Sequence, residues 1–356
     1  MKKSASLVHF ALVLASGLIG VATTEAGLRL IDGVAVFDRR NFISEALDIA
    51  RVNSTQLDFD DQLGWTLMAG LKGPGLTTTR FGIRNNGVGR SLLPSGAVLA
   101  VGNSFTAGSQ VTDGDTWPAQ LERLIRRPVL NAGVGAYGVD QMVLRAESLA
   151  RELRPSTVIV GILSQDSLRN AYDVYGGGMK PWFNLADGRL ELRNVPVRRF
   201  AQTGRGLGTF RSIFGYSYAV DRAMIHLGLQ HYWIDGASAY HRVMENRAAV
   251  DVSCALLKRL KEVGRQQDFD VIVLMLWGAQ EAADKNAPWY GVELVACARA
   301  MELKTLDLHP DLHRISVENP AQFAALWVNE GGALGHPSAM GHEITARRLR
   351  EQFFAP

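Results

Sequence analysis

From Gly96 onward, short apolar segments alternate with longer amphipathic ones, and this alternation restricts the possible folds more than any other feature of the chain. Short apolar runs between turns are typical of strands buried on both faces, whereas longer amphipathic segments are typical of helices that cover them. The alternation predicts a parallel sheet between two helical layers. We expect its five strands at Ala97–Val101, Pro128–Asn131, Thr157–Leu163, Asp270–Leu276 and Lys304–Leu308.

The expected helices fall between and after these strands, at Trp117–Arg126, Gly138–Leu153, Glu245–Gln266, Pro288–Met301 and Ser338–Phe354. In open parallel sheets, ligands bind outside the carboxyl ends of the strands. The turns that follow the strands are therefore where functional side chains are expected.

One long insertion, at residues 168–240, interrupts the alternation. It contains a hairpin-like segment, Asp187–Leu192, and a helix-like segment, Thr209–Leu229. Long insertions in compact domains often form lids or binding loops. Because this one follows a strand end directly, it is expected either to shape a substrate cleft or to form a surface lobe.

The N-terminus is expected to be a targeting segment. Lys2 and Lys3 precede an uncharged run from Leu7 to about Ala22. The run suits an uncleaved signal anchor or a signal peptide, with Thr24–Ala26 as a weak cleavage site. Either way, the lysines stay inside and the remainder is exported, which predicts inner-membrane attachment and an extracytoplasmic domain. We therefore divide the chain into a targeting segment at 1–33, a connecting strap at 34–95 and the main domain at 96–356.

Composition excludes several classes of protein. The chain has 356 residues, of which 47% are hydrophobic and 21% charged, and its formal net charge is +3. No basic stripe with interleaved aromatic residues is present, so no nucleic-acid partner is expected. The chain has neither a CxxC motif nor a Cys/His cluster with zinc spacing, so we expect no metal and no cofactor.

The two cysteines, Cys254 and Cys297, lie in expected helices on either side of one strand. Successive right-handed crossovers place such helices side by side. In an oxidising compartment the pair can form a disulfide. Two separate buried thiols are the alternative.

Four motifs follow the expected strands or lie in the last loop. The first, Val101–Val111, carries a serine, Ser104, in a turn of small residues. The others are Val129–Gly138, Val158–Asp166 and Gly335–His342. A serine delivered at a strand end in this way is a candidate nucleophile, although Gly/Ser turns are also common in ordinary connections.

In this order, the four motifs resemble the four blocks of the SGNH/GDSL hydrolases, which are serine esterases. The resemblance implies a three-layer α/β/α, flavodoxin-like (SGNH) fold with a parallel five-stranded sheet. Further segments resemble the exported, membrane-anchored branch of this family, namely Asp61–Trp65, Gly82–Arg90, Trp117–Glu122 and Tyr137–Gln141.

The resemblance implies Ser104 as nucleophile and His336 as its general base. A serine hydroxyl is a weak nucleophile unless a base lies within hydrogen-bond reach. His342 is the rival base, but it falls inside the last expected helix, where a structural role is expected. His309 and His313 flank a loop and have no supporting motif.

The family's aspartate, three residues before the histidine, is replaced here by Ala333. That carboxylate normally orients the imidazole. Glu330 or Asp307 is a candidate substitute, and a backbone carbonyl that orients His336 in a Ser–His dyad is another.

An oxyanion hole is implied as well. Ester hydrolysis develops negative charge on a carbonyl oxygen, which fixed donors must meet. The implied donors are the Ser104 N–H, the N–H of Gly135 or Ala136, and the side-chain amide of Gln165, where the family has asparagine. In the first block, Asn103 occupies the position of the usual aspartate.

These features predict an SGNH-type serine esterase acting on acyl esters, expected to be acetyl esters, of an envelope or secreted glycan or another small ester. An O-acetyltransferase of an exopolysaccharide would share the acyl-enzyme chemistry. A non-catalytic, carbohydrate-binding accessory protein is the alternative from another class, motivated by Ala333 and Gln165.

Overall fold

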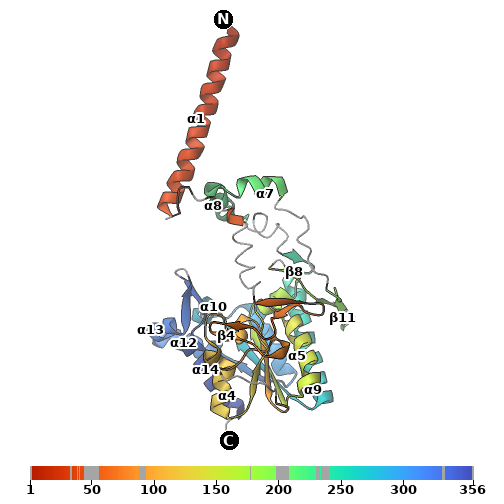
Figure 1. Cartoon of the computed structure of the whole chain (residues 1–356). Coiled ribbons are helices and arrows are strands. Elements are labelled where there is room, and N and C mark those ends of the chain that lie inside the picture. Colours follow the sequence, from red (N-terminus) through yellow and green to blue (C-terminus); the bar gives the residue numbers. More distant parts are fainter. Residues whose placement is uncertain are drawn as a thin grey trace. The chain divides into compact units, whose positions relative to one another are not determined.

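The computed structural model describes residues 2–32, 34–37, 39, 41–43, 56–87, 94–176, 178–197, 208–229, 233, 240–330 and 333–354. Contacts divide the chain into two compact units. The smaller unit comprises Met1–Val52 and Phe200–His241, and the larger comprises Asn53–Arg199 and Arg242–Pro356. The larger unit contains the central sheet and all the site residues that the sequence predicts (Figure 1).

The central sheet of the larger unit has five parallel strands, in the order β14-β13-β7-β5-β6. Its strands are β5 (Val98–Gly102), β6 (Val129–Asn131), β7 (Thr157–Leu163), β13 (Asp270–Leu276) and β14 (Lys304–Asp307). Most of their side chains are buried, because helices cover both faces of the sheet. The predicted α/β fold with a parallel five-stranded sheet is confirmed, with each strand boundary within one residue of its expected position.

Strand order determines which face each helix covers. The chain moves from β5 to β6 in one direction and from β6 through β14 in the other, so right-handed crossovers place the intervening helices on opposite faces. On one face, α4 (Trp117–Ile125) packs against α14 (Ala339–Leu349). On the other, α5 (Val139–Leu153) packs against α9 (Asn246–Gln267), which packs against α11 (Trp289–Ala300) (Figure 1).

The last helix ends earlier than expected. The sequence predicts a helix to Phe354, but α14 stops at Leu349, and Arg350–Phe354 forms a π-helical turn. Its start agrees with the prediction, because the Ser338 hydroxyl accepts a hydrogen bond from the Gly341 N–H as an N-cap.

Shorter elements complete the larger unit around the ends of the sheet. They are α3 (Ser104–Ala107), η3 (Asp113–Asp115), α6 (Asp166–Arg169), α10 (Ala279–Ala283), α12 (His309–Glu318), α13 (Pro320–Ala325), β15 (Trp327–Glu330) and β16 (Ala333–Pro337). Strands β15 and β16 pair antiparallel, so the expected last loop is a hairpin.

The strap before the first motif is more ordered than its sequence suggests. It forms β1 (Leu57–Asp60), β2 (Gly64–Leu67), β3 (Lys72–Gly73), β4 (Leu76–Thr77) and η2 (Arg80–Gly82). A buried arginine, Arg84, ties the strap to the domain, donating to the Asp113 carboxylate and to the carbonyls of Ala107 and Gly108. A buried cation needs partners on each of its donors, and this network supplies them.

The insertion divides between the two units. Its first part belongs to the larger unit and forms β8 (Tyr172–Tyr175), β9 (Gly178–Met179), β10 (Trp182–Ala186) and β11 (Arg189–Arg193). The expected hairpin is β10–β11, which turns at Asp187 and Gly188. The second part forms α7 (Gly208–Phe214) and α8 (Tyr218–His226) in the smaller unit, and the short strand β12 (His241–Arg242) follows.

Within the smaller unit, the N-terminal helix α1 (Lys2–Ile31) supplies an acidic cap to α8. The Glu25 carboxylate accepts hydrogen bonds from the main-chain N–H groups of Tyr218 and Ala219 at 2.8 and 2.9 Å. An anion at a helix N-terminus satisfies free N–H groups and complements the helix dipole. Among the described residues, no helix combines the length and apolar character needed to cross a membrane.

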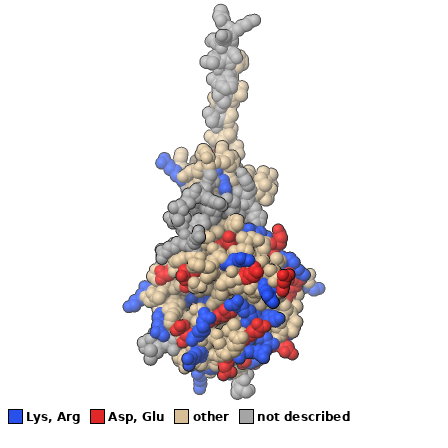
Figure 2. Space-filling model, turned by 90° about the vertical axis from the view of Figure 1, so that its right-hand side faces the viewer, with Lys and Arg blue, Asp and Glu red and all other residues tan. Residues whose placement is uncertain are grey.

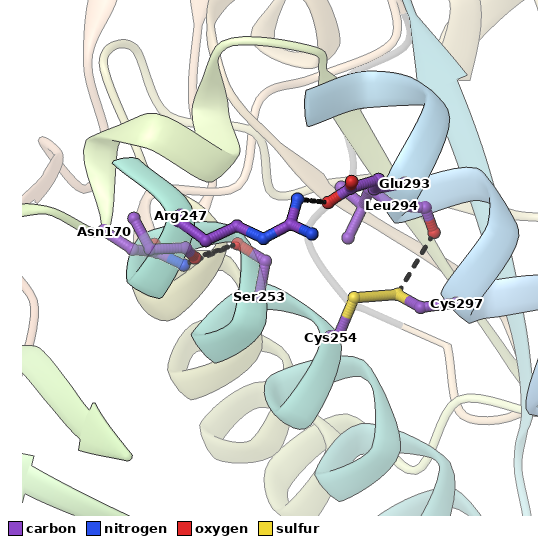
Figure 3. Close-up of a disulfide and its surroundings, with 8 residues drawn as sticks. Asn170, Arg247, Ser253, Cys254, Glu293, Leu294 and Cys297 are labelled. Carbon is purple, nitrogen blue, oxygen red and sulfur yellow. Dashed lines mark hydrogen bonds and ion pairs between the residues drawn. A yellow bond between two sulfur atoms is a disulfide. The ribbon is translucent and has the colours of Figure 1, made fainter. Parts of the chain in front are cut away.

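The two cysteines form a disulfide between α9 and α11 (Figure 3). The Cα atoms of Cys254 and Cys297 are 6.0 Å apart, and the bridge closes a segment with a sequence separation of 43. An ion pair between Arg247 and Glu293 joins the same two helices. Of the two alternatives left by the sequence, the structure therefore shows the disulfide.

Charged side chains of both signs are interspersed over the face shown in Figure 2. Elsewhere on the larger unit, Arg314 pairs with Glu318 along α12, and Arg348 of α14 pairs with Asp311 of α12. Exposed pairs of this kind contribute little to stability, about 1 kcal/mol or less each.

Candidate active site

Ser104 lies at the carboxyl end of β5, where the chain turns sharply into α3. Asn103 caps this short helix: its side chain accepts a hydrogen bond from the Phe105 N–H at 2.8 Å. The turn requires glycine at Gly102, because a Cβ there would lie 2.1 Å from the Thr106 hydroxyl oxygen. The small residues of the motif thus hold a half-buried serine at the edge of the sheet.

His336 comes from the β15–β16 hairpin and meets this serine. Its Nε2 atom lies 3.0 Å from the Ser104 hydroxyl oxygen, which is hydrogen-bond distance. The Phe105 ring packs against the imidazole, with ring centroids 5.4 Å apart. The Ser338 N–H donates to the Leu326 carbonyl, which fixes the chain immediately after the histidine.

The position of the family's acid is Ala333, the first residue of β16, and it pairs in register with Glu330. The side chains of these two residues lie outside the described part of the structure. The other candidate acid, Asp307, ends β14 and accepts hydrogen bonds from the Trp277 indole N–H at 2.8 Å and the His309 main-chain N–H at 3.0 Å. The Asp307 Oδ1 atom is therefore bound to residues that follow directly after β13 and β14.

A buried carboxylate, Asp166, connects the first and third motifs. It accepts hydrogen bonds from the Asn103 side-chain amide at 3.0 Å and from the Leu163 N–H at 2.8 Å, and it pairs with Arg169 at 2.6 Å. Burial raises the pKa of Asp166 to about 6, while the Arg169 charge and the Asn103 amide oppose the shift. The Asn103–Asp166 hydrogen bond therefore links the residue before the nucleophile to the end of the third motif.

Gln165 carries the third donor that the resemblance implies for the oxyanion hole. It is exposed and occupies the N-cap position of α6 with helical backbone angles. Its neighbour Ser164 is buried and donates to the Glu281 carboxylate at 2.5 Å. The role of the Gln165 amide as an oxyanion donor stays a prediction.

The second motif passes directly beside the serine. The Val134 N–H donates to the Gly102 carbonyl at 3.0 Å, which brings the next residues, Gly135 and Ala136, next to the nucleophile turn. Ala136 has a left-handed backbone conformation, with φ of +65°. Within the described part of the chain, the N–H groups of Ser104, Gly135 and Ala136 donate no hydrogen bond, so they are available to a ligand.

His342 is a structural histidine. It lies on α14, is 1% exposed, and its Nδ1 atom accepts a hydrogen bond from the Trp117 N–H at 3.2 Å. Burial, together with the nearby charges of Arg84 and His336, lowers the pKa of His342 to about 3. A histidine that stays neutral and accepts from the backbone stabilises the packing of α14 on α4.

The remaining candidate histidines lie elsewhere. The His309 Nε2 atom is 3.1 Å from the Glu281 carbonyl oxygen, and the His313 Nδ1 atom is 3.1 Å from the Ala283 carbonyl oxygen. Their rings stack on each other on α12. Among the residues that the structure describes, no group of three or more His, Cys, Asp or Glu side chains is placed to hold a metal ion.

Three residues hold the site together, Trp65, Tyr137 and Arg169. The sequence places Trp65 and Tyr137 in segments that carry the resemblance without giving them a role at the site, and it gives no signal for Arg169. The Trp65 indole N–H and the Arg169 guanidinium each donate to a carbonyl of the second motif. A tryptophan in the strap and an arginine four residues after Gln165 were visible in the sequence, but nothing in the spacing indicated that they converge on one loop.

No family model matches this chain, and no curated protein matches it. Several solved structures are similar. The acetylxylan esterase Axe2 from Geobacillus stearothermophilus aligns at 16% identity over 74% of this chain and 97% of its own, with a TM-score of 0.42. The acetyl xylan esterase AlAXEase aligns at 10% identity over 72% and 99%, with a TM-score of 0.42.

A protein of the G-D-S-L family from Desulfitobacterium hafniense DCB-2 aligns at 13% identity over 73% of this chain and 100% of its own, with a TM-score of 0.40. Similarities this distant carry no inference about activity, which therefore depends on the geometry of the site.

Proposed function

We propose that this protein is a serine esterase of the SGNH type that cleaves acyl esters. The observation that carries the proposal is the 3.0 Å contact between the Ser104 Oγ and His336 Nε2 atoms. It is supported by the Ser104, Gly135 and Ala136 N–H groups, which make no hydrogen bond within the described residues. A nucleophile, a base and free donors beside one another are the minimum set for acyl transfer.

The geometry supports the following reaction. The Ser104 hydroxyl oxygen attacks the ester carbonyl while His336 Nε2 takes its proton. Main-chain N–H groups receive the negative charge that develops on the carbonyl oxygen. The C–O bond to the alcohol then breaks, and His336 returns the proton to the leaving oxygen. His336 next deprotonates a water, which attacks the carbonyl carbon of the acyl-Ser104 ester. The bond from that carbon to the Ser104 oxygen then breaks, and His336 returns the proton to the Ser104 oxygen, which releases the acid and the free serine.

We also propose that the site works outside the cytoplasm on acetyl esters of an envelope or secreted glycan. The Lys2–Lys3 pair before an uncharged run favours export, and the Cys254–Cys297 disulfide suits an oxidising compartment. Alkaline phosphatase fused after about residue 60 should be active in a bacterial host. Fractionation of the cells then distinguishes membrane attachment from release.

The decisive test is hydrolysis of p-nitrophenyl acetate and of an acetylated oligosaccharide by the purified protein. Ser104→Ala and His336→Ala should each lower turnover by about 10³-fold or more. Ser109→Ala, in the same loop, and His313→Ala are the matched controls and should keep wild-type turnover. Equal turnover in Ser104→Ala and wild type would refute the proposal.

The same assay separates the alternatives. Adding an unacetylated sugar acceptor and measuring its acetylation distinguishes transfer to a hydroxyl from hydrolysis. Glycan binding without turnover that depends on Ser104 would favour the carbohydrate-binding accessory protein.

A further inference from the structure

Trp65, in strand β2 of the strap, reaches the second motif and fixes one peptide group there. Its indole Nε1–H donates to the Gly135 carbonyl oxygen at 3.0 Å. That carbonyl belongs to the same planar peptide as the Ala136 N–H. In a trans peptide the C=O and N–H bonds point in opposite directions. Holding the Gly135 carbonyl toward the strap therefore turns the Ala136 N–H away from it.

Trp65 is itself held rigidly. The Tyr137 hydroxyl donates to the Trp65 main-chain carbonyl at 2.5 Å, and the two rings meet edge to face with centroids 5.9 Å apart. On the other side the indole lies against β9 of the insertion, where a Cβ at Gly178 would come within 3.0 Å of the ring. The neighbouring Gly64 packs even more closely, since a Cβ there would lie 2.2 Å from the Met179 carbonyl oxygen.

The far end of the same loop is tied to the third motif. The Arg169 guanidinium donates to the Tyr137 carbonyl at 3.1 Å, and it also pairs with the buried Asp166. Asp166 in turn accepts from Asn103, the residue before the nucleophile. The loop that carries Gly135 and Ala136 is thus fixed from the strap on one side and from the serine turn on the other.

We propose that Trp65 is a positioning residue for ester hydrolysis, which acts through the Ala136 N–H, one of the two second-motif N–H groups that the resemblance implies as oxyanion donors. This inference rests on the proposed function. The Val134–Gly102 hydrogen bond brings the Gly135–Ala136 peptide beside Ser104, and the Ala136 N–H has no acceptor within the described residues. The indole N–H sets the direction in which that donor points.

Two replacements of Trp65 test this in the full-length protein with p-nitrophenyl acetate. Trp65→Phe keeps a ring but removes the N–H. Replacement by β-(3-benzothienyl)alanine substitutes sulfur for the N–H with almost no change of shape, so it separates the hydrogen bond from packing. Trp182→Phe, in β10, is the matched control.

Loss of an oxyanion donor costs about 10²–10³ in kcat, and loss of the bond that aims it should cost about tenfold. We expect both Trp65 replacements to lower kcat by about tenfold, with KM changed less than about twofold. Inhibition by a boronic acid, which forms a tetrahedral adduct with the serine, should weaken in parallel with kcat. Trp182→Phe should keep wild-type kcat.

Wild-type kcat in the benzothienyl variant would overturn the inference, as would equal losses in Trp65→Phe and Trp182→Phe. A rise in KM without loss of kcat would also overturn it, because uniform binding and not orientation would then be affected. These outcomes leave the proposed function standing. A wild-type protein without turnover that depends on Ser104 would overturn the proposed function and this inference with it.

Discussion

Replacing His342 with asparagine should make the protein more resistant to acid without affecting catalysis. In the folded state this histidine is 1% exposed, and its pKa is lowered from 6.5 to about 3. In the unfolded chain His342 has its ordinary pKa. Between the folded and the unfolded pKa, the unfolded state therefore binds the proton more tightly than the folded state does. Folding stability must then fall as the pH is lowered through the unfolded pKa.

The size of the effect follows from the two pKa values. For an unfolded pKa of 6.5 and a folded pKa of about 3, His342 removes about 2 kcal/mol of unfolding free energy between about pH 7.5 and about pH 5. An asparagine does not titrate, and its side-chain oxygen can replace Nδ1 as acceptor for the Trp117 N–H. Any loss of packing in His342→Asn changes the unfolding free energy by the same amount at every pH.

The assay is urea unfolding of both proteins at several pH values. As the pH is lowered from about 7.5 to about 5, the unfolding free energy of wild type should fall by about 2 kcal/mol more than that of His342→Asn. Taking the difference removes groups that titrate equally in both proteins. His336→Asn is the matched control, since it should abolish ester hydrolysis and leave the acid dependence of stability in place.

A constant difference between wild type and His342→Asn across this pH range would show that the folded histidine titrates normally, and the argument from burial would fail. Loss of ester hydrolysis in His342→Asn with unchanged stability would show that His342, and not His336, is the base.

Three further predictions follow from other parts of the structure. Burial raises the pKa of Asp166 to about 6, so the contribution of Asp166 to stability falls as the pH rises. Between about pH 5 and about pH 7.5, the unfolding free energy of wild type should fall by about 1 kcal/mol relative to that of Asp166→Asn. A rise over this range would contradict the prediction. Replacing Cys254 and Cys297 together with alanine should cost about 4 kcal/mol for a loop with a sequence separation of 43, measured by urea unfolding, and no loss would argue against the disulfide. Ala333→Asp should raise turnover of p-nitrophenyl acetate by about tenfold or more, because a carboxylate there can orient His336, while Ala333→Asn should not; equal rates in both would place the orienting group elsewhere.

The sheet could be predicted because strands that are buried on both faces are continuous apolar runs in the sequence. Runs such as Thr157–Leu163 are continuous and apolar, and the helices between them carry one apolar face. The Ser338 N-cap was equally local, since it depends on one side chain and the next turn of helix. The strap was missed as ordered structure because its strands are short and its pairing is held by Arg84, a contact that no local pattern records.

For the site as well, some features could be predicted from the sequence and others could not. From the sequence alone, Ser104 was assigned to a strand end and His336 to the last loop, since both lie in turns whose small residues and caps are local features. Only the tertiary structure decides that their side chains meet at 3.0 Å, that His342 is buried against Trp117, and that Gln165 is exposed. Burial and hydrogen-bond partners depend on residues that are distant in the chain, and they set both the pKa of a histidine and the direction of a peptide N–H.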